Sequence, residues 1–233
     1  MFPYFAQLAH ASEKSADEPA NIAYKLTPSF YQASDGNNAV DVNLRANIGS
    51  HTAWIGEYRD KDGYRQARTG YENRLDLEFT RWVFSAQFAS GGFAGGSVTT
   101  EIGGDTFGIL GFGRTNLRDY YNLNFDPNDA ITIGVGSRAL HNTELSFFQV
   151  RDDRLNTQQR VTHCVWRYKP SDLQRITVDA SYKSGLTNEN ILIAGYGLSA
   201  TYDYDRYFGR IARDQYANFT RSHLTRFSLG MRF

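Results

Sequence analysis

The chain has 233 residues, enough for one large domain or two small ones. Its 25 Lys and Arg equal its 25 Asp and Glu, which leaves none of the basic excess that a nucleic-acid partner normally requires. The 16 Phe, 15 Tyr and 3 Trp, together with 21 Gly, indicate an all-β protein. The single cysteine, Cys164, excludes an intramolecular disulfide, and the apolar stretches are too short for a transmembrane helix.

The N-terminal segment differs from the rest of the chain. It is polar, with weak helical periodicity at best, so we expect residues 1–21 to form an arm or a linker. It also lacks the basic start and the long apolar centre of a secretory signal. Residues 22–233 contain no sequence repeat and no sign of a second domain, which predicts one continuous β-domain.

From residue 22 onward, segments of about ten residues alternate apolar and polar side chains. In AVDVNLRANIG, residues 39–49, Val40, Val42 and Leu44 share one face, and Asp41 and Asn43 share the other. Clusters of Gly, Asn, Asp and Ser separate the segments. We expect about 14 strands, with about 12 as the alternative. The expected strands are residues 22–32, 39–49, 52–60, 72–79, 81–90, 97–103, 106–114, 130–138, 143–151, 160–169, 174–183, 191–204, 207–215 and 223–233.

The connections alternate between short and more polar, longer segments, and the stretch Thr115–Asp129 is the longest. Such alternation is typical of an up-and-down antiparallel meander whose two ends face different surroundings. A closed barrel of that kind has an even number of strands, and its last strand pairs with its first. We therefore predict that residues 223–233 pair with residues 22–32.

Whether the apolar face of the sheet points inward or outward decides the class of protein. A soluble β-sandwich or a lipocalin-like protein turns this face inward with the same period of two. A barrel of about 14 strands is too wide for side chains to fill, so we expect the apolar face outward, in lipid, and the charged face around water. The predicted lumen-lining residues are Lys25, Asp41, Arg45, Glu72, Arg74, Asp76, Arg138, Arg167, Asp179, Lys183, Arg226 and Arg232. The predicted aromatic girdle at the membrane interfaces is Trp54, Tyr58, Trp82, Trp166, Tyr168 and Tyr202.

The chain ends in RFSLGMRF, with apolar Phe227, Leu229, Met231 and Phe233 at every second position. This ending resembles the C-terminal strand of bacterial outer-membrane β-barrel proteins, although Met231 replaces the Tyr most often found there. The resemblance implies a Gram-negative outer membrane, contact with its lipid and lipopolysaccharide, and recognition of these four residues by the barrel-assembly machinery. It also implies that both termini face the periplasm.

No pattern in the sequence predicts a metal or cofactor site. The histidines have no metal-ligand spacing, and there is no nucleophile elbow or phosphate-binding loop. One segment, SRALHNTELS, resembles distantly the His-containing strand of lipid A deacylases, with His141 near Ser137, Thr143, Ser146 and Glu144. The serine expected two places after the histidine is Thr143, and a short turn is the alternative interpretation. The five histidines are His10, His51, His141, His163 and His223.

The sequence therefore predicts a porin-like, monomeric or loosely associated channel for small polar or charged solutes. A slight excess of cations among the predicted lumen residues favours anionic solutes. The alternatives are a lipid-modifying hydrolase, or a non-conducting anchoring or adhesion barrel, possibly excised from a larger export protein, whose loop Thr115–Asp129 binds a partner or plugs the lumen.

Overall fold

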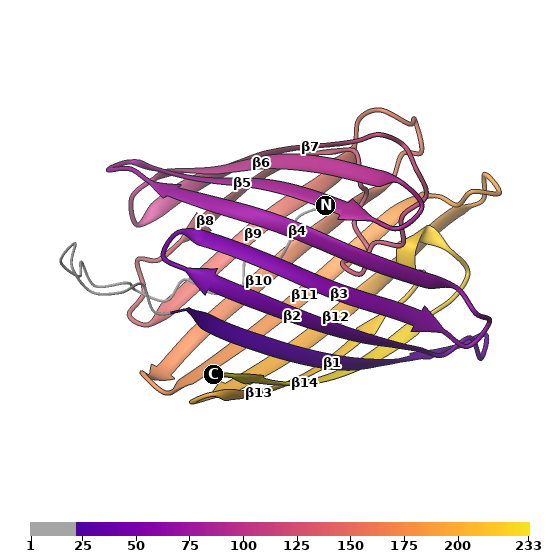
Figure 1. The fold of residues 1–233 in the computed structure, drawn as a ribbon. Coiled ribbons are helices and arrows are strands. Elements are labelled where there is room, and N and C mark those ends of the chain that lie inside the picture. Colours follow the sequence, from indigo (N-terminus) through magenta and orange to yellow (C-terminus); the bar gives the residue numbers. More distant parts are fainter. Residues whose placement is uncertain (1–21) are drawn as a thin grey trace.

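The computed structural model describes residues 22–233, in which fourteen antiparallel β-strands close into one barrel (Figure 1). The predictions of an all-β fold and of a closed barrel with 14 strands are confirmed. The expected arm, residues 1–21, lies outside the described residues. The strands are β1 (Ala23–Ala33), β2 (Ala39–Ile48), β3 (His51–Asp60), β4 (Arg65–Asp76), β5 (Thr80–Ala89), β6 (Phe93–Gly103), β7 (Thr106–Thr115), β8 (Ala130–Ser137), β9 (Thr143–Asp152), β10 (Arg160–Ser171), β11 (Gln174–Leu186), β12 (Leu192–Tyr204), β13 (Tyr207–Asp214) and β14 (Leu224–Arg232).

The barrel closes where β1 meets β14, as the sequence predicts. Phe30 lies opposite Phe227 in this antiparallel pair. At its end, Tyr24 and Phe233 exchange backbone hydrogen bonds of 2.8 and 3.0 Å, and their rings stack with centroids 5.7 Å apart. Because hydrocarbon offers no partner to backbone N–H and C=O groups, this seam removes the free strand edges that an open sheet would expose to lipid.

The two ends of the barrel differ in the length of their connections. The seam residues Tyr24 and Phe233 lie at the end with short turns, called the turn end here, on the left in Figure 1. The opposite end, called the loop end, carries the longer connections, which include a 3-10 helix at Ala217–Phe219 between β13 and β14. The longest is residues 116–129, between β7 and β8.

The boundaries of β4 and β6 differ most from the prediction. The expected strand 72–79 is Arg65–Asp76 in the structure, because the chain turns at residues 77–79, where the Leu77 N–H donates to Thr80 O at 2.8 Å. The apolar side chains of this turn had extended the alternating pattern past the true end of the strand. The expected strand 97–103 begins earlier, at Phe93, since two glycines that look like a loop continue the ladder with β5 and β7.

The outer face of the barrel is apolar. Large side chains such as Ile55, Ile133, Leu198 and Leu229 are 56–70% exposed, as they alternate with inward-facing residues. This arrangement is the reverse of a soluble barrel or sandwich, which buries its apolar face. Within the described residues, no helix has the length and apolar character needed to cross a membrane.

The aromatic girdle was predicted only in part. Trp166, Tyr168 and Tyr202 are exposed on the outer face near the turn end, and Trp82 stacks on the exposed Phe84. The prediction was wrong for Trp54 and Tyr58, which are buried inside the barrel. Trp54 lies opposite Arg45 in the β2–β3 ladder, and directly opposed residues share one face of a sheet. An inward Arg45 therefore requires an inward Trp54.

Candidate functional site: a cavity beside an inward-folded loop

The twelve charged residues expected in the lumen lie in the inward phase of their strands, or, for Arg138, in the turn after β8. The structure does not bring them into one cluster. They divide between a row of ion pairs on β4 to β10 and a basic region on β1, β2 and β14. Of the remaining four, Glu72 lies 3.8 Å from Arg45, Asp179 accepts from His163 Nδ1 at 3.1 Å, Lys183 lies 4.0 Å from Asp214, and Arg232 pairs with Asp203.

The row of ion pairs, called the ion-pair belt here, follows the turn end of the inner wall. Glu101 accepts from Arg81 at 3.3 Å and from Arg138 at 2.5 Å. Glu144 accepts from Arg138 at 2.8 Å and also pairs with Arg167. Each carboxylate thus joins arginines from different elements. The belt comprises Arg74, Asp76, Arg81, Glu101, Arg138, Glu144 and Arg167.

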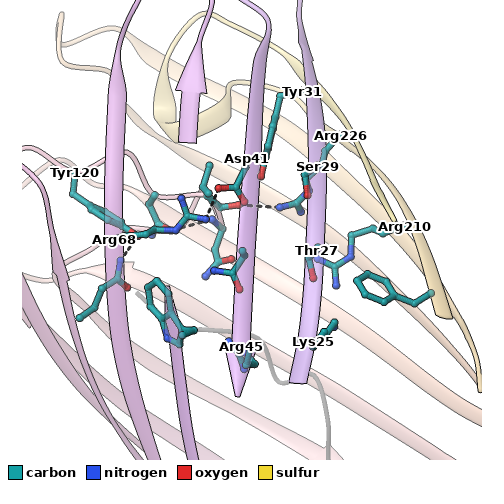
Figure 2. Close-up of a pocket in the computed structure, with 17 residues that line it drawn as sticks. Lys25, Thr27, Ser29, Tyr31, Asp41, Arg45, Arg68, Tyr120, Arg210 and Arg226 are labelled. Atoms are coloured by element: carbon teal, nitrogen blue, oxygen red, sulfur yellow. Dashed lines mark hydrogen bonds and ion pairs between the residues drawn. The ribbon is translucent and has the colours of Figure 1, made fainter. Parts of the chain in front are cut away.

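The opposite side of the lumen holds a cavity of about 120 Å³ (Figure 2). Strands β1, β2, β13 and β14 form most of its wall, with contributions from β3, β4 and β5 and from the loop 116–129. Among residues 22–233, Asp41 is the only acidic residue in the lining, and Arg68 Nη2 donates to it at 2.6 Å. The cationic residues of the lining, called the basic wall here, are Lys25, Arg45, Arg68, Arg210 and Arg226.

Residues 116–129 fold into the barrel and are called the lumen loop here. The side-chain amide of Gln66 on β4 forms two bonds to the backbone of Tyr121, at 2.8 and 3.1 Å. Arg226 on β14 donates to Leu123 O at 3.1 Å. His163 on β10 lies 3.1 Å from Asp126, where the loop begins its return. Contacts to three strands therefore fix the loop across the lumen.

Aromatic packing adds to these hydrogen bonds. The ring of Tyr121 stacks on Tyr58 with centroids 4.9 Å apart, and Phe125 packs in the same cluster with Tyr31. Phe125 is 2% exposed and has a φ of 63°, a backbone conformation that costs a non-glycine residue about 1–2 kcal/mol. Burial also raises the pKa of Tyr121 to about 12. The loop adopts this strained form because its rings are buried.

Inward aromatic rings lie flat against the wall over glycines of the next strand. Trp54 faces Gly70, and Phe208 faces Gly230, as cross-strand neighbours. A Cβ atom at either glycine would overlap the facing ring. Glycine is therefore required for close approach, and each ring occupies the wall instead of the open lumen.

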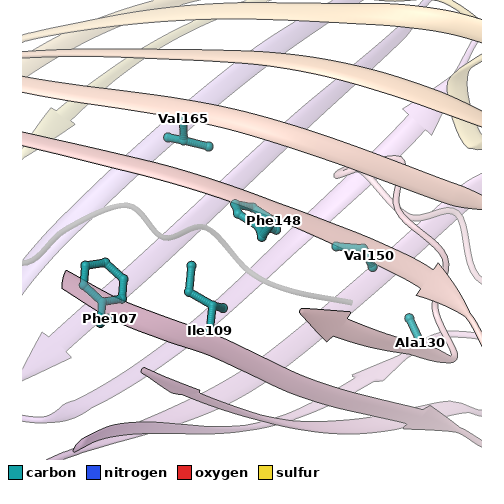
Figure 3. Close-up of a cluster of buried hydrophobic side chains, with 6 residues drawn as sticks. All are labelled: Phe107, Ile109, Ala130, Phe148, Val150 and Val165. Atoms are coloured by element: carbon teal, nitrogen blue, oxygen red, sulfur yellow. The ribbon is translucent and has the colours of Figure 1, made fainter. Parts of the chain in front are cut away.

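Part of the inner wall on β7 to β10 is apolar (Figure 3). This patch faces inward although the sequence predicts a charged inner face throughout. Its members are in the phase of inward residues, and they pack against one another across neighbouring strands. The patch consists of Phe107, Ile109, Ala130, Phe148, Val150 and Val165.

The residues of the hydrolase alternative do not assemble into a catalytic group. His141 is exposed in the turn between β8 and β9, and the Thr143 hydroxyl donates to the backbone carbonyl of His141 at 3.1 Å. Glu144 points into the barrel and pairs with two arginines, while Ser146 is buried on the inner face. Residues 22–233 also contain no group of three or more His, Cys, Asp or Glu placed to hold a metal ion.

Several residues of the site were not predicted. Arg68 and Gln66 lie in the part of β4 that the sequence pattern assigned to a loop, and Arg210 lies in the poorly patterned strand β13. The alternation of Gln66, Arg68 and Gly70 with Ala67 and Thr69 continues the phase of Glu72 and Arg74. Extending the period of two backwards from Glu72 would have placed Gln66 and Arg68 on the inner wall.

Known structures with the same fold are bacterial outer-membrane porins. Outer membrane protein Omp33 of Acinetobacter baumannii matches with a TM-score of 0.57 at 10% identity, over 90% of this chain and 97% of that chain. A mutant of the Rh. blastica porin matches with a TM-score of 0.53 at 8% identity, over 92% of this chain and 100% of that chain. No family model and no curated protein matches the sequence. The chain thus has the porin fold of bacterial outer-membrane barrels, and its apolar outer face fits that membrane.

Proposed function

We propose that the barrel is a non-enzymatic outer-membrane channel for small polar solutes, in which the lumen loop sets the width of the path. The observation that carries this proposal is the cavity between the lumen loop and the basic wall. The loop docks on the wall through Gln66, Arg226 and His163, and it leaves space lined by charged and polar groups beside it.

The distribution of charge supports a hydrated path. Charged side chains are costly in hydrocarbon and in a dry core, but an aqueous lumen solvates them. Lys25 and Arg45 line the cavity, and among the described residues neither forms a hydrogen bond or an ion pair with the lumen loop. A barrel that served only as an anchor would gain nothing from cations around an open space.

A plug is the second candidate, because contacts to three strands hold the lumen loop across the lumen. A plug and a constriction make different predictions for the same variant. If the loop only narrows the path, then the wild-type barrel conducts, and a shorter loop raises its conductance. If the loop is a plug, then the wild-type barrel is silent, and only the shortened variant conducts.

Single-channel recording of the purified barrel in a planar bilayer tests these alternatives. We expect stable current steps for the wild type and larger steps when residues 118–127 are replaced by a short Gly-Ser linker. Glu57→Gln, on the exposed outer face, is the control and should conduct like the wild type. Silence of both the wild type and the shortened variant, with both folded by circular dichroism, would contradict the channel proposal.

A further inference from the structure

Three buried N–H groups around the cavity have no hydrogen-bond acceptor among the described residues. They are Trp54 Nε1 on β3, Arg68 Nη1 on β4 and Arg226 Nε on β14, and all three residues line the cavity. Trp54 and Arg68 are only 7% and 8% exposed. A buried donor without an acceptor costs about 1–3 kcal/mol, more when it is charged. Such donors indicate that the cavity accommodates an acceptor-rich group.

The charge of the cavity has the sign that an anion needs. Arg68 forms an ion pair with Asp41, and Arg45 lies 3.8 Å from Glu72. In contrast, neither Lys25 nor Arg226 has a described carboxylate oxygen within 4.0 Å. Arg226 donates instead to the carbonyl of Leu123 in the lumen loop, and it also hydrogen-bonds with Tyr31. A partly buried cation that has no carboxylate in direct contact is costly, and a bound oxyanion would offset that cost.

Flat aromatic surfaces border the same space. Trp54 lies flat over Gly70, and the Phe208 ring lies with Lys25 Nζ 4.0 Å from its centroid. Tyr120 of the lumen loop forms another part of the lining. Rings of this kind contact the body of an organic solute, whereas the guanidinium groups contact its charged end. An inorganic ion would use only the second feature.

We propose that this cavity is a binding site for a small organic carboxylate, with its oxygens toward Arg226, Arg68 and the Trp54 N–H and its flat body against the aromatic lining at Trp54. This inference deepens the proposed channel function and rests on it for its biological meaning. Because Leu123 and Tyr120 belong to the lumen loop, the site is complete only when the loop is docked.

The test is a binding titration in detergent that uses Trp54 as the reporter. Trp82→Phe and Trp166→Phe together remove the other two of the 3 tryptophans, both of which lie on the outer face. We expect benzoate to change the fluorescence of Trp54 with saturation, and benzamide, which has the same shape but no charge, to bind at least about tenfold more weakly. Equal binding of benzoate and benzamide, or tighter binding of inorganic phosphate than of benzoate, would overturn the proposal.

Variants locate the site. Arg226→Gln should weaken benzoate binding by about tenfold or more, because it removes a charged donor at the carboxylate. Lys25→Gln, which removes a cation without touching the lumen loop, should weaken binding less. Arg81→Gln removes the same charge from the ion-pair belt and should leave binding unchanged. If Arg81→Gln weakens binding as much as Arg226→Gln, then general charge explains the effect and the proposed site is wrong.

The outcomes separate this inference from the channel proposal. Currents in a bilayer without selective benzoate binding would refute the binding site and leave the channel standing. Selective binding without current would leave the site standing and refute the channel. The comparison of benzoate with benzamide uses the reporter protein without a change in the basic wall, so it remains decisive even if Arg226→Gln fails to fold.

Discussion

The ion-pair belt and the basic wall are built from the same residue types on the same inner surface, but they differ in their partners. In the belt, buried Glu101 and half-buried Glu144 each accept from two arginines on different elements. Beside the basic wall, Asp41 is the only acid that the described part of the chain contributes to the cavity lining, and Arg226 bonds to a backbone carbonyl. The belt sets four arginines against three carboxylates, so most of its charge is paired internally, whereas the wall leaves positive charge facing the cavity.

This difference teaches that the number of charges in a lumen does not reveal their role. Paired groups that join several strands hold the wall in shape, and removing one leaves its partners buried without a counter-charge. Unpaired groups contribute little to holding the wall, so their presence needs a solute or an electric field to explain it. The loss of one charge should therefore lower the stability of the barrel in the belt, and should change solute selectivity with little effect on stability in the basic wall.

The largest effect on stability is expected for Glu101→Gln in the belt. Glu101 is 5% exposed, and its loss leaves Arg81 and Arg138 without their common acceptor. We expect the free energy of unfolding to fall by about 2–3 kcal/mol. Denaturant titration monitored by circular dichroism measures this change. Glu57→Gln, which breaks an exposed pair on the outer face, should cost less than about 1 kcal/mol. Equal costs would show that the belt is not structural.

Gly70→Ala should have an intermediate effect on stability. It also tests whether the wall around the cavity, unlike the apolar patch that contains Phe107, affects conductance. The new Cβ overlaps the Trp54 ring, so the ring must move from the wall into the cavity, at about 1–3 kcal/mol. Gly136→Ala overlaps Phe107 on the other side of the barrel and is the matched control. Both variants should lose similar stability, but only Gly70→Ala should lower the single-channel conductance. A similar loss of conductance in both would remove the distinction.

Lys25→Gln should have the smallest effect on stability and a selective effect on transport. Lys25 makes no ion pair with a described residue, so we expect a change below about 1 kcal/mol. The loss of its charge should lower the permeability of anions relative to cations by about twofold, measured as a reversal potential in a salt gradient. Lys169→Gln, in an exposed pair with Asp172 at 3.0 Å, should shift the reversal potential less. A larger shift for Lys169→Gln would place the selective region elsewhere.

The barrel could be predicted from the sequence because its strands repeat one local rule. A period of two, polar connections and an apolar C-terminal strand are readable without knowing any long-range contact. The errors at Trp54 and Tyr58 arose where the two phases of β3 are similar, since Glu57 and Arg59 interrupt the apolar face. The register opposite Arg45 and Gly70 decides that phase, and register is a property of strand pairs.

The cavity could not be predicted in the same way. It depends on the lumen loop folding inward, and the bonds that hold the loop join Gln66 to Tyr121 and Arg226 to Leu123, far apart in the sequence. A polar loop of this length shows no local pattern that distinguishes a docked from a solvent-facing conformation. The buried strained residue Phe125 is visible only once its packing partners are in place.

The ion-pair belt also has a mechanical meaning. Its links run from β4 to β10 around the turn end, so outward bending of these strands would stretch several ion pairs at once. The belt therefore resists outward bending of the part of this rim that β4 to β10 form. Changes in the width of this rim should then occur mainly at the strands outside the belt, β11 to β14 and β1 to β3.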